Sequence, residues 1–219
     1  MYEEMPIITM ITKMGVGMGR TCAIFFLTLL FSLPLGLAVC QMRMSKNKIV
    51  CAFTKAYIAV LRGTPLMLQL LVVTYGPYYL FKINTPTEKL IPVVIAFSLN
   101  YAAYFAEIYR GGIESMSKGQ YEAAEVLGYS KSQCFSRIIL PQVIKRIIPS
   151  VTNEVVTLVK DTSMAFTVAY QEMFTIGQQI AYSQTSFMPF VIAGVFYFIF
   201  NALVGWGSGR FEKRLNYYR

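Results

Sequence analysis

The sequence predicts an all-α membrane protein with five transmembrane helices. Hydrophobic residues make up 55% of the 219 residues and charged residues only 14%, a composition typical of chains that cross a bilayer several times. The charges are grouped, and the apolar runs between them approach the roughly 20 residues that a helix needs to cross the hydrocarbon core. We expect a single transmembrane domain over residues 1–219, with spans at approximately 15–41, 57–82, 89–110, 138–160 and 187–209.

Four of the five spans follow from the length of their uncharged runs. These runs lie in the first, second, third and fifth spans, at residues 21–40, 63–81, 90–106 and 187–209. The fourth span is interrupted by Lys145, Arg146 and Glu154, and we assign it because its other residues are apolar and its neighbours require a crossing. The amino terminus lacks the basic, apolar and small-residue pattern of a signal peptide, so we expect the first helix to stay in the membrane.

Basic residues indicate the side of the membrane on which each loop lies. The net charge of +9 comes mostly from Lys and Arg residues that flank the spans, which topology explains better than binding to nucleic acid. Segments 41–50, 110–137 and 210–219 carry these residues and are expected in the cytoplasm, whereas residues 162–209 contain no Lys or Arg. We therefore expect a multi-pass chain with its amino terminus outside and its carboxyl terminus in the cytoplasm.

The chain offers few residues for catalysis or metal binding. It contains no histidine, which removes the commonest general base and transition-metal ligand. Its four cysteines show no C-x-x-C spacing and fall in the membrane or on the cytoplasmic side, so we expect free thiols. These features argue against a membrane-embedded hydrolase, and we assign no catalytic and no metal-binding residues.

The largest polar insertion, residues 114–135, predicts a helix, a tight turn and a second helix. Two S-x-x-Q sequences, beginning at Ser117 and Ser130, fit the capping box, in which side chain and backbone satisfy each other's free hydrogen-bonding groups. Gly128 directly follows the first predicted helix, residues 118–127, where a left-handed residue commonly ends a helix. Such a short helix is unstable alone in water, and its small alanine side chains permit close approach by a partner.

The same insertion carries a longer motif. Its pattern is E-A-A, three residues, G, nine residues and I-x-L-P, formed by Glu122, Ala123, Ala124, Gly128, Ile138, Leu140 and Pro141. The pattern resembles the cytoplasmic signature of permease subunits in binding-protein-dependent ABC importers. The stretches R-G-T-P at 62–65 and K-D-T-S at 160–163 are similar to the polar amino-acid branch of that family. The resemblance extends from the second predicted span to the fifth.

The resemblance implies a type I ABC importer permease of a bacterial inner membrane, which is a transport subunit and not an enzyme. Such a subunit pairs with a second permease subunit, as a homodimer or a heterodimer, and receives substrate from an extracytoplasmic amino-acid-binding protein. Residues 171–180 are expected to form an outward helix on that receiving surface. The resemblance also implies a coupling helix that docks on an ABC ATPase dimer, and its coupling residues would be Glu122, Ala123, Ala124 and Gly128. The chain has no G-x-x-x-x-G-K-[ST] loop and no cofactor of its own is expected, so ATP and Mg would be bound by the partner ATPase.

A polar stripe on the fourth span is the candidate substrate site. Glu154 lies nine residues beyond Lys145, or roughly 13 Å deeper along a helix, which places it near the middle of the membrane. Asp161 follows seven residues later on nearly the same helical face. Ionisable residues inside spans are costly and are functional candidates for that reason. We predict a cavity that accepts a polar amino acid, lined by Glu154, Asp161, Thr157, Asn100 and Tyr104.

The same residues allow other interpretations. Glu154 could instead be protonated or paired with Lys160 or a neighbouring helix, and Asp161 could simply cap the segment after it. An acidic cavity favours cationic substrates such as arginine, lysine or histidine, although an acid could equally bind the α-ammonium group of any amino acid. An ion-coupled secondary amino-acid transporter would also need intramembrane acids, and an assembly subunit would have no translocation path. We interpret Arg62 and Glu107, at the ends of spans, as structural.

Overall fold

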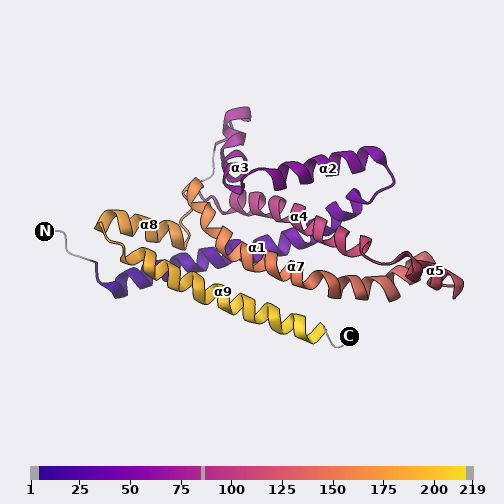
Figure 1. Ribbon diagram of the computed structural model, residues 1–219. Helices are drawn as coiled ribbons and strands as arrows, with labels where there is room; N and C mark the ends of the chain where they lie inside the picture. The colour runs from indigo at the N-terminus through magenta and orange to yellow at the C-terminus, as the bar shows by residue number, and fades with distance from the viewer. Residues whose placement is uncertain (1–4, 85–86, 216–219) are drawn as a thin grey trace.

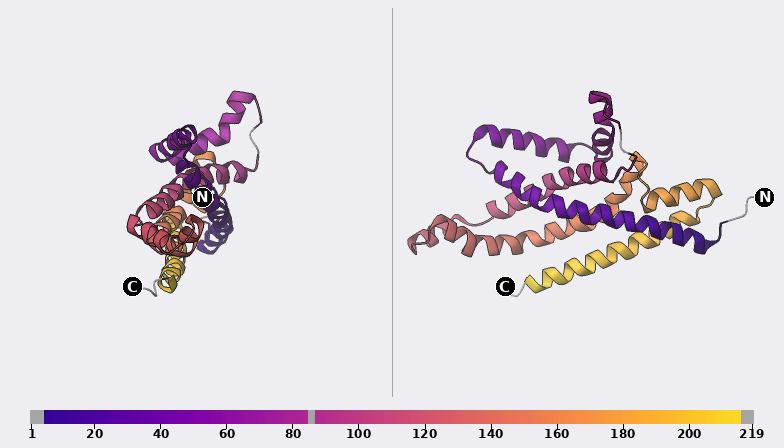
Figure 2. Two further views of the ribbon diagram at one scale, coloured as in Figure 1. Left: turned by 90° about the vertical axis from the view of Figure 1, so that its right-hand side faces the viewer. Right: turned by 180° about the vertical axis from the view of Figure 1, so that it is seen from behind.

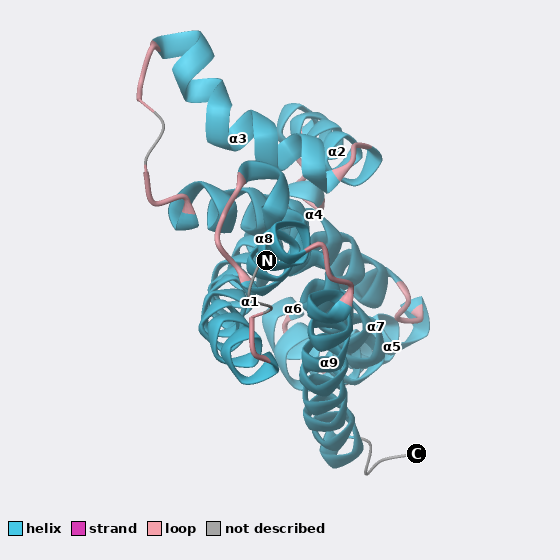
Figure 3. Ribbon diagram, turned by 90° about the vertical axis from the view of Figure 1, so that its left-hand side faces the viewer, coloured by secondary structure: helices cyan, strands magenta, loops and turns pink. Residues whose placement is uncertain are grey.

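The computed structural model describes residues 5–84 and 87–215, and every regular element in these residues is a helix (Figures 1 and 3). In chain order the elements are α1 (Ile7–Arg43), α2 (Lys48–Gly63), α3 (Leu66–Phe81), α4 (Leu90–Glu114), α5 (Lys118–Val126), α6 (Lys131–Gln133), the π-helix η1 (Cys134–Ile139), α7 (Leu140–Asp161), the 3-10 helix η2 (Thr162–Val168), α8 (Met173–Gln184) and α9 (Met188–Leu215). The predicted all-α class is confirmed. Figure 1 shows an elongated bundle with α8 near one end and α5 at the other.

Three helices, α1, α4 and α9, are each long and apolar enough to cross a membrane. They correspond to the spans expected at 15–41, 89–110 and 187–209, and they run along the length of the bundle beside α7 (Figures 1 and 2). Many of their large apolar side chains are exposed, including Phe26, Leu30, Phe198 and Leu203. In a bilayer such surfaces face lipid or a neighbouring subunit.

The span expected at 57–82 is not one continuous helix. The helix α2 ends at Gly63, α3 begins at Leu66, and the chain bends by 110° between them. The cause is Pro65, which has no backbone N–H and disfavours a helical conformation in the residue before it. Thr64 accordingly has extended angles, with φ −118° and ψ 148°. The two helices are together apolar enough for one bent span, and α3 turns away from the rest of the bundle (Figures 2 and 3).

The helix expected at 138–160 begins differently and is more polar than the other spans. The π-helix η1 occupies Cys134–Ile139, and the regular helix α7 starts only at Leu140. The 22 residues of α7 measure about 33 Å, which is enough to cross the hydrocarbon core. Its charged residues, however, leave it outside the helices that are apolar enough to span by composition. That α7 crosses the membrane stays a prediction, which depends on the spans α4 and α9 on either side.

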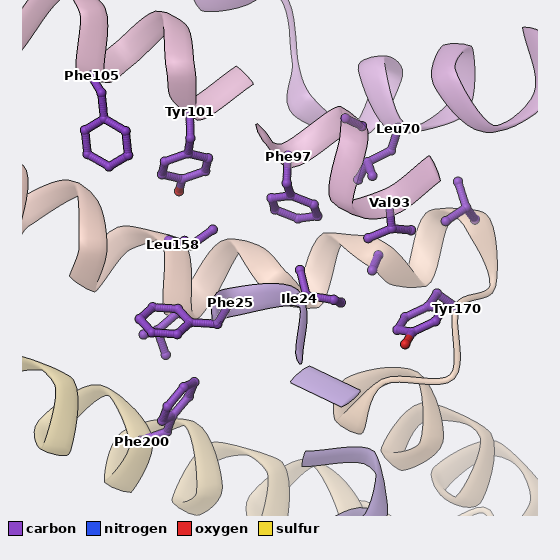
Figure 4. Packing of buried hydrophobic residues seen from close by; sticks show 14 residues of the cluster. Ile24, Phe25, Leu70, Val93, Phe97, Tyr101, Phe105, Leu158, Tyr170 and Phe200 are labelled. Carbon is purple, nitrogen blue, oxygen red and sulfur yellow. The ribbon is translucent and has the colours of Figure 1, made fainter. Parts of the chain in front are cut away.

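The core lies where α4 packs against α1 and α7. The helices α1 and α4 make the most extensive contact of any pair described. Gly36 allows this closeness, because a Cβ atom at that position would lie only 2.8 Å from Cβ of Phe105. Side chains of four helices meet at the centre (Figure 4): Ile24, Phe25, Phe97, Tyr101, Phe105, Leu158 and Phe200.

The helix expected at 171–180 is α8, which a buried carboxylate anchors to the bundle. Glu172, fully buried, precedes α8 and accepts hydrogen bonds at 2.7 Å from two backbone N–H groups of its first turn. The same carboxylate accepts bonds from the hydroxyl groups of Tyr197 on α9, at 3.1 Å, and Thr21 on α1, at 3.4 Å. Glu172 therefore connects three helices, a role that the sequence alone does not predict.

Candidate functional site

The five residues predicted to bind substrate line a single cavity of about 390 Å³. The helix α7 contributes Glu154, Thr157 and Asp161, and α4 contributes Asn100 and Tyr104. The other lining residues are Thr64, Pro65, Leu66, Tyr101 and Met164. The structure therefore brings the predicted residues together and adds the break between α2 and α3 as a third wall.

The cavity wall on α7 follows from the helical repeat. Glu154, Thr157 and Asp161 are spaced three and four residues apart, so they fall on one face of the helix. Leu158 and Val159 project elsewhere and are fully buried in the core. The packing of these apolar residues fixes the rotation of α7 and so turns its acidic face toward the cavity.

Asp161 is held by a residue that the sequence-based prediction misses. The hydroxyl group of Tyr101 donates a hydrogen bond to Oδ2 of Asp161 at 2.7 Å, and Tyr101 is only 2% exposed. Asp161 makes no capping bond to the helix η2 that follows it, so the alternative role as a simple cap is not observed. Tyr101 lies three residues before Tyr104 on α4, and this helical spacing could have identified Tyr101 from the sequence as a residue facing the same cavity.

Glu154 is half-buried and lacks a close partner in the described part of the chain. No hydrogen bond or ion pair there involves its carboxylate, and Lys160, the partner considered from the sequence, is exposed. None of the lining residues is a Lys or Arg, but the charge of Arg62, which lies over the ring of Tyr104, acts on Glu154. Within residues 5–84 and 87–215, no three acidic, cysteine or histidine side chains are grouped so that they could hold a metal ion.

Asn100 supports the cavity wall. Its side-chain amide is buried and donates to the carbonyl of Leu61 at 3.0 Å and to Oε1 of Gln69 at 2.9 Å. Gln69 in turn donates to the carbonyl of Thr64 at 3.1 Å. These bonds satisfy carbonyl groups that the helix break at Pro65 frees, which stabilises the third wall. The side-chain amide of Asn100 thus donates both of its hydrogen bonds to groups of the protein itself.

Arg62 and Glu107 form a charged cluster next to the cavity. Glu107 accepts hydrogen bonds from Arg110 at 2.7 and 3.0 Å, as their spacing predicts. Arg62 lies 3.9 Å from Glu107 and its guanidinium group stacks 5.0 Å from the ring centre of Tyr104. Both residues therefore have structural partners.

The predicted coupling residues lie in and after α5. Glu122 and Ala123 are exposed, whereas Ala124 is buried and packs against the base of α7. Gly128 has a φ of +79°, as predicted for a glycine that ends a helix. Its N–H donates to the carbonyl of Glu125 at 3.0 Å, and the next N–H donates to the carbonyl of Ala124 at 3.0 Å. These are the two bonds of a Schellman motif.

One of the two predicted capping boxes is present. Ser130 and Gln133 exchange the expected bonds, at 2.9 and 3.3 Å. The prediction for Ser117 is wrong, because its side chain makes no capping bond. The side chain of Gln120, which should complete that box, instead bonds to Gln142 on α7. A tertiary contact has replaced the local one.

The comparisons with known proteins agree with these features. The family model described as "Binding-protein-dependent transport system inner membrane component" matches residues 32–217. The chain is 38% identical over 200 residues to the L-cystine transport system permease protein TcyL of Bacillus subtilis (strain 168), covering 89% of this chain and 84% of that protein. It is 33% identical over 190 residues to the putative glutamine transport system permease protein GlnP of Rickettsia bellii (strain RML369-C), covering 86% of each.

A similar structure has also been solved. The crystal structure of an amino acid ABC transporter with histidines contains a chain that superposes with a TM-score of 0.86 and 29% sequence identity. The superposition covers 96% of this chain and 99% of that chain.

Proposed function

Since this chain belongs to the family of binding-protein-dependent transport system inner membrane components, we propose that its acidic cavity is the transport site for polar amino acids, above all arginine, lysine and histidine. The chain is an all-helical permease subunit of an amino-acid ABC importer and not an enzyme. It is an inner-membrane protein that works with ATPase and binding-protein partners.

One observation carries the substrate proposal. Glu154 and Asp161 face the same cavity, and none of the residues that line it is basic. Its volume of about 390 Å³ falls within the range of roughly 300–1,000 Å³ that is usual for small-molecule sites. A cationic side chain entering it would be attracted by both acids. The hydroxyl groups of Thr157 and Tyr104 would form hydrogen bonds with the polar groups of the amino acid.

The coupling proposal follows from α5. We expect an ABC ATPase dimer, with its bound ATP and Mg, to dock on the exposed side of α5 around Glu122 and Ala123. A second permease subunit, identical or homologous, would complete the translocation path. With α5 in the cytoplasm, the carboxyl terminus of α9 is also cytoplasmic and the amino terminus is outside. This orientation places α8 on the side that receives the binding protein.

The alternative of an ion-coupled secondary transporter predicts a different energy source. Membership of a binding-protein-dependent family and the exposed α5 favour ATP. The test is uptake into proteoliposomes that contain the complete transporter, with ATP supplied or with an ion gradient alone. Import that follows the ion gradient without ATP would reject the ABC mechanism.

The substrate class is tested by competition. Uptake of labelled arginine is measured in the presence of an excess of each other amino acid. We expect lysine and histidine to compete and acidic amino acids to have no effect. Equal competition by neutral amino acids would mean that the acids bind the common α-ammonium group, and a lack of arginine uptake would overturn the cationic proposal.

A further inference from the structure

One uninterrupted helical segment connects the loop at α5 with the acidic cavity. The chain is helical from Lys131 to Val168, through α6, η1, α7 and η2. Figure 1 shows α5 at the end of α7 that lies far from α8. Glu154 follows Gln142 by 12 positions, or about 18 Å along α7. A displacement at the base of α7 therefore reaches the cavity through the helix that carries its acids.

Two glutamines attach α5 to the base of α7. The Gln120 Nε2 donates to Gln142 Oε1 at 2.9 Å, and the Gln142 Nε2 donates back to Gln120 Oε1 at 3.1 Å. Gln142 also donates to the backbone carbonyl of Ile138, in η1, at 2.8 Å. Because each amide both donates and accepts, the pair holds the two helices in one defined register.

The pair spans the π-helical part of this connection. Between α5 and α7 the chain passes through η1, and π-helical turns are rare and frequent at functional sites. The glutamine pair bypasses η1 and joins α5 directly to α7.

Other contacts around the pair also hold the two elements together. Ala124 of α5 packs against Cys134, Ile139 and Val143, and such apolar contacts are not directional. Arg146 donates to the carbonyl and hydroxyl oxygens of Ser115, at 2.7 and 2.9 Å, but Ser115 ends α4 rather than belonging to α5. The glutamine pair adds directional side-chain bonds between α5 and α7.

We infer that Gln120 and Gln142 are positioning residues that pass the movement of α5 to α7 and so to the transport cavity. This inference rests on the proposed function, in which α5 docks on the ATPase. Breaking the pair should leave docking and ATP hydrolysis in place but reduce the number of amino acids imported per ATP hydrolysed.

Isosteric substitutions can break the pair without changing its volume. A carboxylate accepts hydrogen bonds but cannot donate them, so Gln120→Glu and Gln142→Glu each retain one of the two reciprocal bonds. The double variant retains neither bond and places two carboxylates opposite each other. Gln41→Glu is the matched control for the single variants. Gln41 is an exposed glutamine near the end of α1, and its substitution changes the charge by the same amount.

The complete transporter, with its ATPase and binding protein, is reconstituted in proteoliposomes and given a mixture of labelled amino acids. The measurements are uptake, ATP hydrolysis and the amount of ATPase that co-purifies with the permease. For each single variant we expect import per ATP within about threefold of wild type, and for the double variant a decrease of about fivefold or more. Gln41→Glu should match wild type.

The possible failures are distinguishable. A double variant that imports as many amino acids per ATP as Gln41→Glu would overturn the inference while leaving the proposed function intact. Loss of co-purifying ATPase in the double variant would also overturn it, because the pair would then serve assembly rather than transmission. A wild-type transporter that imports no amino acid with ATP would overturn the proposed function itself, and this inference with it.

Discussion

Replacing Gly128 by alanine should loosen the turn after α5 even though the added methyl group touches nothing. Gly128 has a φ of +79°, and a Cβ atom there would have no other atom within 4 Å. The cost therefore comes from the backbone alone, and it is about 1–2 kcal/mol for an L-residue in the left-handed region. At 1.4 kcal/mol for each factor of ten, this shifts the equilibrium between the closed turn and an open loop by roughly 5- to 30-fold.

Hydrogen exchange at Tyr129 reports this equilibrium, because its N–H closes the turn by donating to the carbonyl of Ala124 at 3.0 Å. In Gly128→Ala we expect exchange to be faster by about the same 5- to 30-fold and uptake to decrease. Gly128→Asn is the matched control, since asparagine tolerates left-handed angles better, and it should have a smaller effect. Wild-type exchange in Gly128→Ala, or equal effects of alanine and asparagine, would refute the backbone explanation.

Two further predictions concern stability, and thermal unfolding of the permease in detergent measures both. Gly36→Ala should destabilise the α1–α4 contact by about 1–3 kcal/mol, because its Cβ would lie 2.8 Å from that of Phe105; Gly15→Ala, with nothing within 4 Å, should be neutral or stabilising. Equal effects at the two glycines would contradict this account of the packing. Glu172→Ala should destabilise by about 2 kcal/mol or more, since it removes a helix cap and leaves buried donors unpaired. Unfolding at the wild-type temperature would show that Glu172 is not an anchor.

The sequence predicts best those features that depend on a regular repeat. The spans at α1, α4 and α9 follow from uncharged runs, which need only be long enough. The acidic face of α7 follows from the spacing of Glu154, Thr157 and Asp161, and the turn after α5 follows from a glycine at a helix end. In each case the local pattern and the tertiary structure favour the same conformation.

Features that depend on a distant partner could not be predicted in this way. Ser117 fits a capping box, but Gln120 bonds instead to Gln142, 22 positions along the chain. Tyr101 becomes important only when α4 and α7 pack together and bring its hydroxyl to Asp161. The break at Pro65 was not predicted, because a proline inside an apolar run can also be tolerated within a membrane helix.

We propose that the two acids of the cavity select cationic substrates, and this selection can be measured as the ratio of arginine to glutamine uptake in wild type and in Glu154→Gln. Glu212→Gln serves as the control, because Glu212 does not line the cavity. A hydrogen bond to a charged group contributes roughly 1.5–3 kcal/mol, so we expect the ratio to fall by about tenfold or more in Glu154→Gln and to stay constant in the control. An unchanged ratio in Glu154→Gln would contradict the claim.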